Sequence, residues 1–304
     1  MGKVWEHYYN LFIDKISYIV NDKVVLEIGC PSGKLATRCN DYKKCYIVDP
    51  NKNDKIQFNE NIVFIQDFFD NNFTSNERID FILHSHLFEH IYEPNIFLQK
   101  CHELLSDEGE MVFGVPNMEH LTKVSLFLGI FFEHTIFLNK TNITYLLNKN
   151  GFEILQIIDY EKHSTIYHVR KSKIVLNVPE CKVYDYLEQF FTMNSDNTKF
   201  VNICNSTIDN NPTKPVYIFG ASYNTQYLLS IGIDETRLTG VLDNCKEKQN
   251  KYLYGSLLKI YSPEIVRDTD SIVILKNGYY TKEIAVQLKS INPNILLVCN
   301  EDIV

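Results

Sequence analysis

The sequence predicts an α/β protein with a doubly wound, mainly parallel sheet, followed by a second and smaller α/β domain. Three observations predict this fold class: short apolar runs alternate with helical or polar segments, a glycine turn follows the first run, and the alternation starts again after residue 215. Such apolar runs are typical of parallel strands that helices cover on both faces. We expect one domain at residues 1–195 and another at residues 213–304.

The first domain is predicted to alternate helices and strands along the chain. Val4–Val20 carries apolar residues at three- and four-residue intervals, which predicts an amphipathic helix. Apolar runs predict strands at Val24–Ile28, Cys45–Val48, Ile62–Ile65, Asp80–Leu83 and Glu110–Val115. Helices are expected at Asn95–Leu105, Leu121–Phe132 and Thr141–Lys149. Two late runs are expected to form an antiparallel pair of strands, Phe152–Ile158 and Thr165–Arg170.

The second domain is predicted to begin after a polar boundary. Val183–Met193 is expected to be a connecting helix, and residues 194–215, rich in Asn and Thr, are expected to be the linker. The apolar runs beyond it predict strands at Val216–Phe219, Leu238–Asp243, Ser271–Leu275 and Ile295–Val298. Helices are expected between them at Asn224–Ile231 and Thr281–Ile291.

Composition restricts the classes of function. A net charge of -8 without a cluster of Lys and Arg argues against a broad nucleic-acid surface. The 8 cysteines include no C-x-x-C pair, which argues against a zinc ribbon. Because no signal peptide or membrane-spanning apolar run is seen, we expect a cytoplasmic protein with reduced thiols and no membrane partner.

The loop after the first strand indicates a ligand other than a dinucleotide or a nucleoside triphosphate. Gly29 and Gly33 let the backbone approach a ligand at the carboxyl end of the strand. A dinucleotide fingerprint would have glycine at Pro31, and a phosphate-binding loop would have Ser or Thr at Leu35. The loop therefore fits neither of those nucleotide-binding patterns.

Three acids at successive strand ends indicate which ligand this is. Glu27 lies beside the loop, where a carboxylate would repel a phosphate and favour an amino or sulfonium group. Asp49, which ends the second strand, is placed to accept both ribose hydroxyls, and Asp67 follows the third strand within reach of an adenine amino group. An adenosine with a cationic amino-acid tail fits all three, so we expect S-adenosylmethionine.

Residues 24–158 resemble a class I S-adenosylmethionine-dependent methyltransferase of the bacterial sugar methyltransferase type. The resemblance lies in five segments that occur in the order of the family: VVLEIGCPSG, YIVDP, DFILHSHLFEHIYEP, LLSDEGEMVFGVPN and LLNKNGFEI. It implies a Rossmann-like methyltransferase sheet. It also implies a donor site formed by Glu27, Gly29, Gly33, Asp49, Asp67 and His84. Pro31 departs from the family pattern on the methionine side of this site.

A group of histidines and glutamates is the candidate for chemistry, and three interpretations of it stay open. In the first, Glu89 and His90 form hydrogen bonds that serve only the fold. In the second, His90 or His134, with Glu133, is the general base that takes a proton from a hydroxyl as the methyl group is transferred. In the third, a divalent metal ion bound by His86, Glu89, His90 and His134 lowers the pKa of that hydroxyl.

The third interpretation rests on a resemblance to metal-dependent methyltransferases that act on RNA ribose or catechol-like hydroxyls. Those enzymes use a carboxylate, a Glu-His pair and a later His. Here His86 stands in place of the first carboxylate, which shifts the expected preference from Mg toward Mn, Fe or Zn. Asn117, which follows the fifth strand, is expected to line the acceptor pocket.

The second domain resembles the C-terminal domain of sugar C-methyltransferases, in the segments VYIFGASYNTQYLL, LTGVLDNCKEKQNKYLYGSLLKI and DSIVILKNGYYTKEI. The resemblance implies that Tyr223, Asp243 and Lys246 contact a sugar nucleotide. Support of the first domain, or a homodimer interface, is the alternative role.

The two resemblances favour O-methylation of a nucleotide-activated sugar, as in capsule polysaccharide or surface-glycan biosynthesis. The Tyr-x-Glu-His segment of the C-methyltransferases has phenylalanine at residue 131 here, and their cysteine-rich zinc domain has no counterpart at the start of this chain. Losing the tyrosine hydroxyl weakens the alternative of C-methylation on a keto-deoxysugar. A non-catalytic, methyltransferase-like binding protein is the other alternative, for which Pro31 is the main argument.

Overall fold

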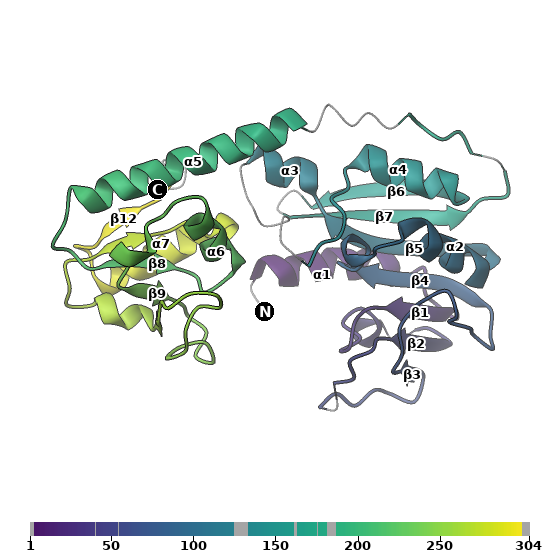
Figure 1. The fold of residues 1–304 in the computed structure, drawn as a ribbon. Coiled ribbons are helices and arrows are strands. Elements are labelled where there is room, and N and C mark those ends of the chain that lie inside the picture. The colour runs from purple at the N-terminus through teal and green to yellow at the C-terminus, as the bar shows by residue number, and fades with distance from the viewer. Residues whose placement is uncertain are drawn as a thin grey trace. The chain divides into compact units, whose positions relative to one another are not determined.

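The computed structural model describes residues 3–39, 41–53, 55–124, 133–160, 163–174, 176–180 and 187–299 (Figure 1). By its internal contacts the chain divides into two units, residues 1–121 with 132–184 and residues 122–131 with 185–304. Each unit has its own sheet and its own apolar cores.

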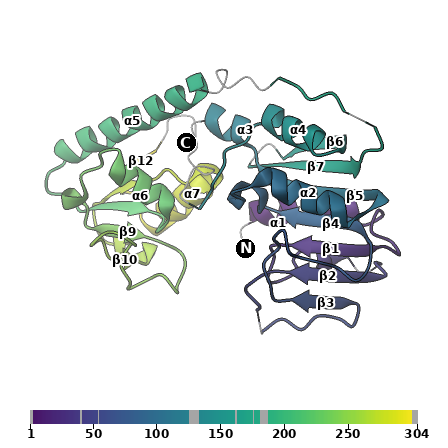
Figure 2. The same ribbon diagram turned by 45° about the vertical axis from the view of Figure 1, so that its right-hand side comes forward.

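Seven strands form the sheet of the first unit in the order β3-β2-β1-β4-β5-β7-β6, and Figure 2 shows β4, β1, β2 and β3 side by side. The parallel strands are β1 (Val24–Ile28), β2 (Lys44–Val48), β3 (Ile62–Ile65), β4 (Ile79–Ser85) and β5 (Leu105–Pro116). The antiparallel strands are β7 (Ser164–Lys171), paired with β5, and β6 (Phe152–Tyr160), paired with β7. Because the strand order reverses between β1 and β4, ligands are expected at the carboxyl ends of these two strands.

Helices cover both faces of this sheet, and each face has its own core. α2 (Pro94–Leu104) and α4 (Lys140–Lys149) pack on one face, and α1 (Lys3–Ile16) packs on the other. Leu26 of β1 belongs to the first core and Val25 to the second, because successive strand residues point to opposite faces. A strand covered on both faces must be apolar throughout, which explains the unbroken apolar runs of the sequence.

The second unit has a five-stranded parallel sheet in the order β10-β9-β8-β11-β12. Its strands are β8 (Val216–Phe219), β9 (Gly240–Leu242), β10 (Ile260–Tyr261), β11 (Ile272–Ile274) and β12 (Leu296–Val298). α5 (Leu187–Asp209) and α6 (Tyr223–Ser230) pack on one face and α7 (Thr281–Ile291) on the other. The predicted fold class, a doubly wound sheet with a second and smaller α/β domain, is confirmed.

The segment that was expected to link the domains is a helix in the structure. α5 runs from Leu187 to Asp209 and belongs to the second unit, which therefore starts before residue 213. The segment is rich in Asn and Thr, yet one side of the helix carries a narrow apolar stripe. The polar residues lie on the opposite side of the helix. The buried residues recur at three- and four-residue intervals: Met193, Asn197, Phe200, Val201, Cys204 and Ile208.

The helix expected at Leu121–Phe132 falls mostly outside the described residues. α3 is described at Met118–Lys123, and residues 125–132 are not described. In the described part of the chain, no helix has both the length and the apolar character needed to cross a membrane.

Candidate active site

The loop after β1 is shaped by two glycines in the left-handed backbone region. Gly29 has φ +71° and Gly33 has φ +54°, a region that residues with a side chain rarely adopt. A Cβ at residue 29 would lie 2.7 Å from Leu87 Cδ1, so the loop packs directly against the segment that follows β4. The donor loop predicted from the sequence therefore lies next to the predicted histidine–glutamate cluster.

Pro31 fits this loop. The backbone N–H of Gly33 donates to the carbonyl of Cys30 at 3.0 Å, which closes a tight turn with Pro31 in its second position. Proline is favoured there because its fixed φ matches the turn and no N–H is needed. The departure from the family pattern therefore leaves the loop intact.

Glu27 forms hydrogen bonds with the segment that follows the loop. Its side chain is buried, and its two carboxylate oxygens accept the backbone N–H groups of Leu35 (3.2 Å) and Ala36 (2.8 Å). Burial raises the pKa of Glu27 to about 7, and the two backbone hydrogen bonds offset part of that effect. This carboxylate therefore holds the segment after the loop in place.

Glu27 should make the stability of the protein depend on pH. Because its folded-state pKa lies above the ordinary value of 4.5, the folded protein retains a proton that the unfolded chain has lost. We therefore expect the free energy of unfolding to fall between about pH 5 and pH 7, by up to ~1.4 kcal/mol per pH unit. Denaturant unfolding of the wild type and of Glu27→Gln across this range checks it. Parallel pH profiles for the two proteins would contradict the prediction.

Asp49 and Asp67 lie at the ends of neighbouring strands. The backbone N–H of Asp49 donates to the carbonyl of Ile65 at 3.2 Å, so the residues after β2 and β3 stay side by side. Asp49 is buried, and its Oδ1 accepts the N–H of Asn51 at 2.7 Å; burial raises the pKa of its carboxyl group. Asp67 is exposed, and its Oδ1 accepts the N–H of Phe68 at 2.8 Å. The spatial order of Gly29, Asp49 and Asp67 thus follows the order of β1, β2 and β3.

His84 lies opposite Ile28 where β4 pairs with β1, but its side chain points into the core and not into the loop. Its ring is buried in the core and stacks on Phe113 with the centroids 4.8 Å apart, and neither ring nitrogen has a hydrogen-bond partner among the described residues. Burial lowers the pKa of His84 to about 3, so the ring is neutral. His84 is enclosed by the fold and has no surface left for a ligand, which corrects its assignment to the donor site.

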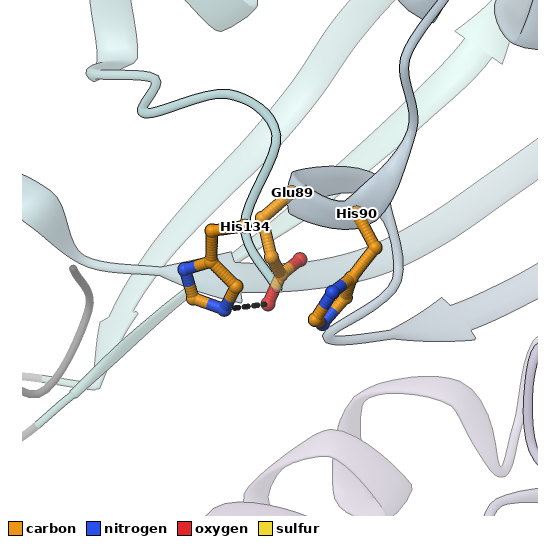
Figure 3. A group of neighbouring side chains, drawn as sticks. All are labelled: Glu89, His90 and His134. Atoms are coloured by element: carbon orange, nitrogen blue, oxygen red, sulfur yellow. Dashed lines mark ion pairs between the residues drawn. The ribbon is translucent and has the colours of Figure 1, made fainter. Parts of the chain in front are cut away.

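Glu89, His90 and His134 come together after β4 (Figure 3). The first two residues lie in a 3-10 helix, η2 (Phe88–His90), and His134 reaches them from a later loop. One potential ligand atom from each side chain lies within 4.8 Å of the other two, and His134 Nε2 is 3.9 Å from Glu89 Oε1. Glu89 and His134 are buried, while His90 is half-buried.

Hydrogen bonds run in both directions between η2 and the loop that carries His134. His90 Nδ1 lies 2.8 Å from the backbone carbonyl of Glu133, which can only accept, so the ring donates. The N–H of Thr135 donates to the carbonyl of Glu89 at 2.9 Å. The side chain of Glu133, predicted to be catalytic, is exposed, and its backbone carbonyl is the group that holds the cluster.

His86 belongs to a second layer behind Glu89. Its Nδ1 lies 3.0 Å from Glu89 Oε1 and its Nε2 lies 2.8 Å from Ser164 Oγ, which also contacts His163 Nδ1. The ring of Trp5 packs on His163 at a centroid distance of 4.2 Å. His86 is therefore outside the group of potential metal ligands in which the sequence placed it.

Sequence reasoning missed this second layer. Ser164 lies opposite Pro116 where β7 pairs with β5, and Trp5 comes from α1, so only the folded sheet brings them to His86. No local pattern in the sequence signals a contact across that separation. Asn117, predicted to bind the acceptor, is buried, and its Oδ1 accepts the N–H of His120 at 3.1 Å at the start of α3.

The second unit has a pocket of about 220 Å³ at the carboxyl ends of β8, β9 and β10. Tyr223, one of the predicted substrate residues, lines it, and burial raises its pKa to about 12. Asp243 accepts the N–H groups of Ala221 and Cys245, both at 2.8 Å, and Lys246 is exposed and does not line the pocket. Sequence reasoning missed several lining residues: Gln226, Glu247, Lys248, Lys251, Tyr252 and Tyr254. Lys248 and Lys251, three residues apart after β9, were the sequence feature that could have indicated this pocket.

Comparison with known families decides the class of the protein. A family model described as a methyltransferase domain matches residues 4–157, which span half of the chain. The chain belongs to this methyltransferase family. The methyltransferase expected from the sequence is thereby confirmed, and S-adenosylmethionine stays its expected methyl donor. Among curated proteins, no sequence matches the chain.

Several solved methyltransferase structures are similar to part of this methyltransferase. The N-methyltransferase NodS from Bradyrhizobium japonicum WM9 has 15% identity and a TM-score of 0.42, over 57% of this chain and 98% of that one. Magnesium protoporphyrin IX methyltransferase from Synechocystis PCC 6803 has 14% identity and a TM-score of 0.43, over 56% and 84%. The 1,6-didemethyltoxoflavin-N1-methyltransferase of Burkholderia thailandensis has 15% identity and a TM-score of 0.42, over 53% of this chain and 78% of that one. The family assignment rests on the family model alone.

The strand ends of the methyltransferase sheet fit the donor. The absence of a side chain at Gly29 lets Leu87 pack directly on the loop, which sets the loop beside the segment that follows β4. Asp49 is a buried carboxylate with one oxygen committed to the N–H of Asn51. A buried carboxylate at the end of the second strand suits a pair of ribose hydroxyls, which can donate to it.

Proposed function

We propose that this methyltransferase transfers the methyl group to a hydroxyl of a nucleotide-activated sugar, as required for capsule or surface-glycan biosynthesis. The observation that carries the proposal is the cluster of Glu89, His90 and His134 at the strand ends, joined to the donor loop through the contact of Leu87 with Gly29. A buried cluster of this composition can take a proton from an acceptor beside the donor.

The donor is assigned to the ends of β1, β2 and β3. Asp49 accepts the ribose hydroxyls, Asp67 receives the adenine amino group, and the backbone at Gly29 and Gly33 holds the methionine part. Glu27 acts indirectly, because both of its oxygens already accept backbone N–H groups. Glu27 thus shapes the segment after the loop without direct contact with the donor.

The reaction needs alignment and removal of one proton. The acceptor oxygen forms a bond to the methyl carbon, the carbon–sulfur bond breaks, and its electron pair stays on sulfur. The hydroxyl proton passes to the cluster of Glu89, His90 and His134. Alignment of the acceptor with the donor supplies much of the acceleration, and proton removal in the transition state contributes ~100- to 10,000-fold.

The pocket of the second unit supports a nucleotide-activated substrate. Lys248 Nζ donates to the carbonyl of Ala221 at 2.8 Å and lies 3.5 Å from Asp243 Oδ2, so it is held at the pocket wall. Lys251 lines the pocket with no ion-pair partner among the described residues. Tyr252 and Tyr254 are 64% and 86% exposed, which leaves their faces open to a base. Cationic groups beside open aromatic rings suit a nucleoside diphosphate.

Lys251 should contribute to binding of the nucleotide, whereas Lys246 should not. We expect Lys251→Ala to raise the Kd for the matching nucleoside diphosphate ~10-fold, because a hydrogen bond to a charged group contributes ~1.5 kcal/mol. Lys246→Ala, which removes the same charge outside the pocket, is the matched control. Titration calorimetry of both variants at two salt concentrations measures the effect. Equal loss in the two variants would mean that only the overall charge matters.

A panel assay tests the proposed function. The full chain is incubated with S-adenosylmethionine and with sugars linked to GDP, UDP, CDP or dTDP, and the products are identified by mass spectrometry. We expect methylation of one class of nucleotide sugar, with the methyl group on a sugar oxygen. Methylation at carbon, or no methylation of any sugar by protein that binds the donor, would overturn the proposal.

A further inference from the structure

Glu89 carries a carboxylate oxygen that needs a partner. The side chain is 5% exposed, and Oε2 has no hydrogen-bond partner among the described residues. Oε1 accepts a hydrogen bond from His86 Nδ1 at 3.0 Å. A buried carboxylate with one unpaired oxygen is costly, because its lost hydration is not replaced. A cation beside this oxygen would replace it.

A cavity with the size of a single ion or water lies beside Glu89 and His134, and His90 stands outside its lining. Glu89 and His134 line a pocket of about 10 Å³ whose other walls are apolar side chains, among them Phe88, Pro116 and Met118. About 10–15 Å³ is enough for one water molecule. The space therefore admits one small occupant, with the carboxylate and the imidazole as its polar neighbours.

The ring of His90 is oriented as metal-binding imidazoles are. Because Nδ1 donates to the carbonyl of Glu133 at 2.8 Å, the neutral ring carries its proton on Nδ1 and a lone pair on Nε2. Metal-ligating histidines almost always donate the other ring N–H to a carbonyl or a carboxylate in this way. The hydrogen bond selects the tautomer that can bind a cation.

The residues behind the cluster fix the carboxylate. His86 Nδ1 donates to Glu89 Oε1, and Ser164 Oγ lies 2.8 Å from His86 Nε2. The backbone N–H of His86 donates to the carbonyl of Gly114 at 2.8 Å, in a left-handed conformation with φ +52°. His86 is therefore a positioning residue that acts through Glu89.

We propose that Glu89, His90 and His134 form a binding site for one divalent transition-metal cation. Two imidazoles and one carboxylate are a ligand set of Fe²⁺, and imidazole suits Zn²⁺ and Fe²⁺ better than Mg²⁺ or Ca²⁺, which prefer oxygen ligands. Ligand atoms ~2.1 Å from an ion lie ~3–3.4 Å apart, so the group, now within 4.8 Å, contracts when the cation binds. The remaining positions are open to water and to the acceptor hydroxyl.

The cation deepens the proposed function, on which its role toward the acceptor rests. A hydroxyl bound to a divalent cation loses its proton near neutral pH, because the positive charge stabilises the oxyanion. In the transfer itself the oxygen–carbon bond forms and the carbon–sulfur bond breaks with its electron pair kept by sulfur. With the cation bound, Glu89, His90 and His134 act as its ligands, and the hydroxyl proton leaves to water instead of to these side chains. Binding of the cation does not require a sugar and can be tested alone.

Metal titration of the full chain tests the site. The protein is prepared without a polyhistidine tag, stripped with chelator and titrated with ZnCl₂, MnCl₂ and MgCl₂ by calorimetry, and metal content is measured by mass spectrometry. We expect one Zn²⁺ per chain and weaker Mg²⁺. A Co²⁺-substituted sample should show visible absorption bands that shift in His134→Gln.

Matched substitutions make the result specific. His90→Gln and His134→Gln should raise the Kd for Zn²⁺ at least ~30-fold, since each removes one of three ligands. His168→Gln is the control, because the buried His168 pairs with the half-buried Glu110 on the same sheet (2.5 Å) outside the cluster. The Kd of this variant for Zn²⁺ should stay unchanged. Circular dichroism and the Tm of each variant confirm folding.

The outcomes separate the site from the proposed function. No bound metal, or equal loss of Zn²⁺ affinity in His134→Gln and His168→Gln, would overturn the metal site. Sugar methylation that is unaffected by chelator would overturn it too and would leave the histidine–glutamate cluster as the base. Stoichiometric Zn²⁺ binding without methylation of any nucleotide sugar would instead sink the proposed function and leave the metal site standing.

Discussion

His134→Ala is expected to lower the rate of methyl transfer at least ~100-fold while the Kd for S-adenosylmethionine changes less than ~3-fold. The reason is geometric: His134 Nε2 lies 3.9 Å from Glu89 Oε1, in the cluster proposed for the acceptor, whereas the donor is assigned to the ends of β1, β2 and β3. Single-turnover kinetics at saturating donor, together with calorimetry of donor binding, measure the two quantities separately.

The control for this prediction is His168→Ala. His168 is also a buried histidine paired with a glutamate, but the pair lies where β5 meets β7, away from η2. We expect its turnover to stay within ~3-fold of wild type. If His134→Ala loses donor affinity and turnover in equal proportion, the assignment of His134 to the acceptor side is wrong.

Asp49→Asn is expected to raise the Kd for S-adenosylmethionine ~10- to 100-fold with a smaller change in turnover at saturating donor. The substitution keeps an oxygen for the N–H of Asn51, so the turn after β2 is preserved. It removes the charged acceptor for the ribose hydroxyls, and hydrogen bonds to charged groups contribute ~1.5–3 kcal/mol. Calorimetry with the donor and with S-adenosylhomocysteine measures the change.

Asp234→Asn provides a matched control for Asp49→Asn. Its Oδ1 accepts the N–H of Thr236 at 3.0 Å, the same local turn, but in the second unit. We expect donor affinity to be unchanged in this variant. An equal loss of donor affinity in the two variants, or an unchanged donor affinity in Asp49→Asn, would show that Asp49 does not bind the ribose.

Periodicity predicted most of the fold because the sheet is covered on both faces. β1, β3, β8 and α7 begin and end where the apolar runs predict, since an unbroken apolar run between turn residues is the pattern of a buried parallel strand. α5 was missed because its apolar stripe is narrow and its polar side is rich in Asn and Thr. The polar composition of this segment led to the prediction of a linker, although the three- and four-residue spacing of its apolar residues indicated a helix.

The sequence predicted only those parts of the candidate site whose residues are close together in the chain or lie at predicted strand ends. Glu89 and His90 are neighbours in sequence, and the ends of β1 and β2 are fixed by strand order, so both could be named in advance. Ser164 and Trp5 reach His86 through antiparallel pairing and helix packing, which no short segment encodes. The two backbone N–H groups that the oxygens of Glu27 accept could not be named from the sequence, and the contact of Glu27 with the donor stays a prediction.

A crystal structure of the full chain with S-adenosylhomocysteine tests the central claim most directly. The account predicts that the product lies at the ends of β1 and β2, with its ribose hydroxyls on Asp49, its amino-acid part along the backbone from Gly29 to Gly33, and its sulfur facing Glu89 and His134. A product bound elsewhere, or with its sulfur turned away from these two side chains, would contradict the account.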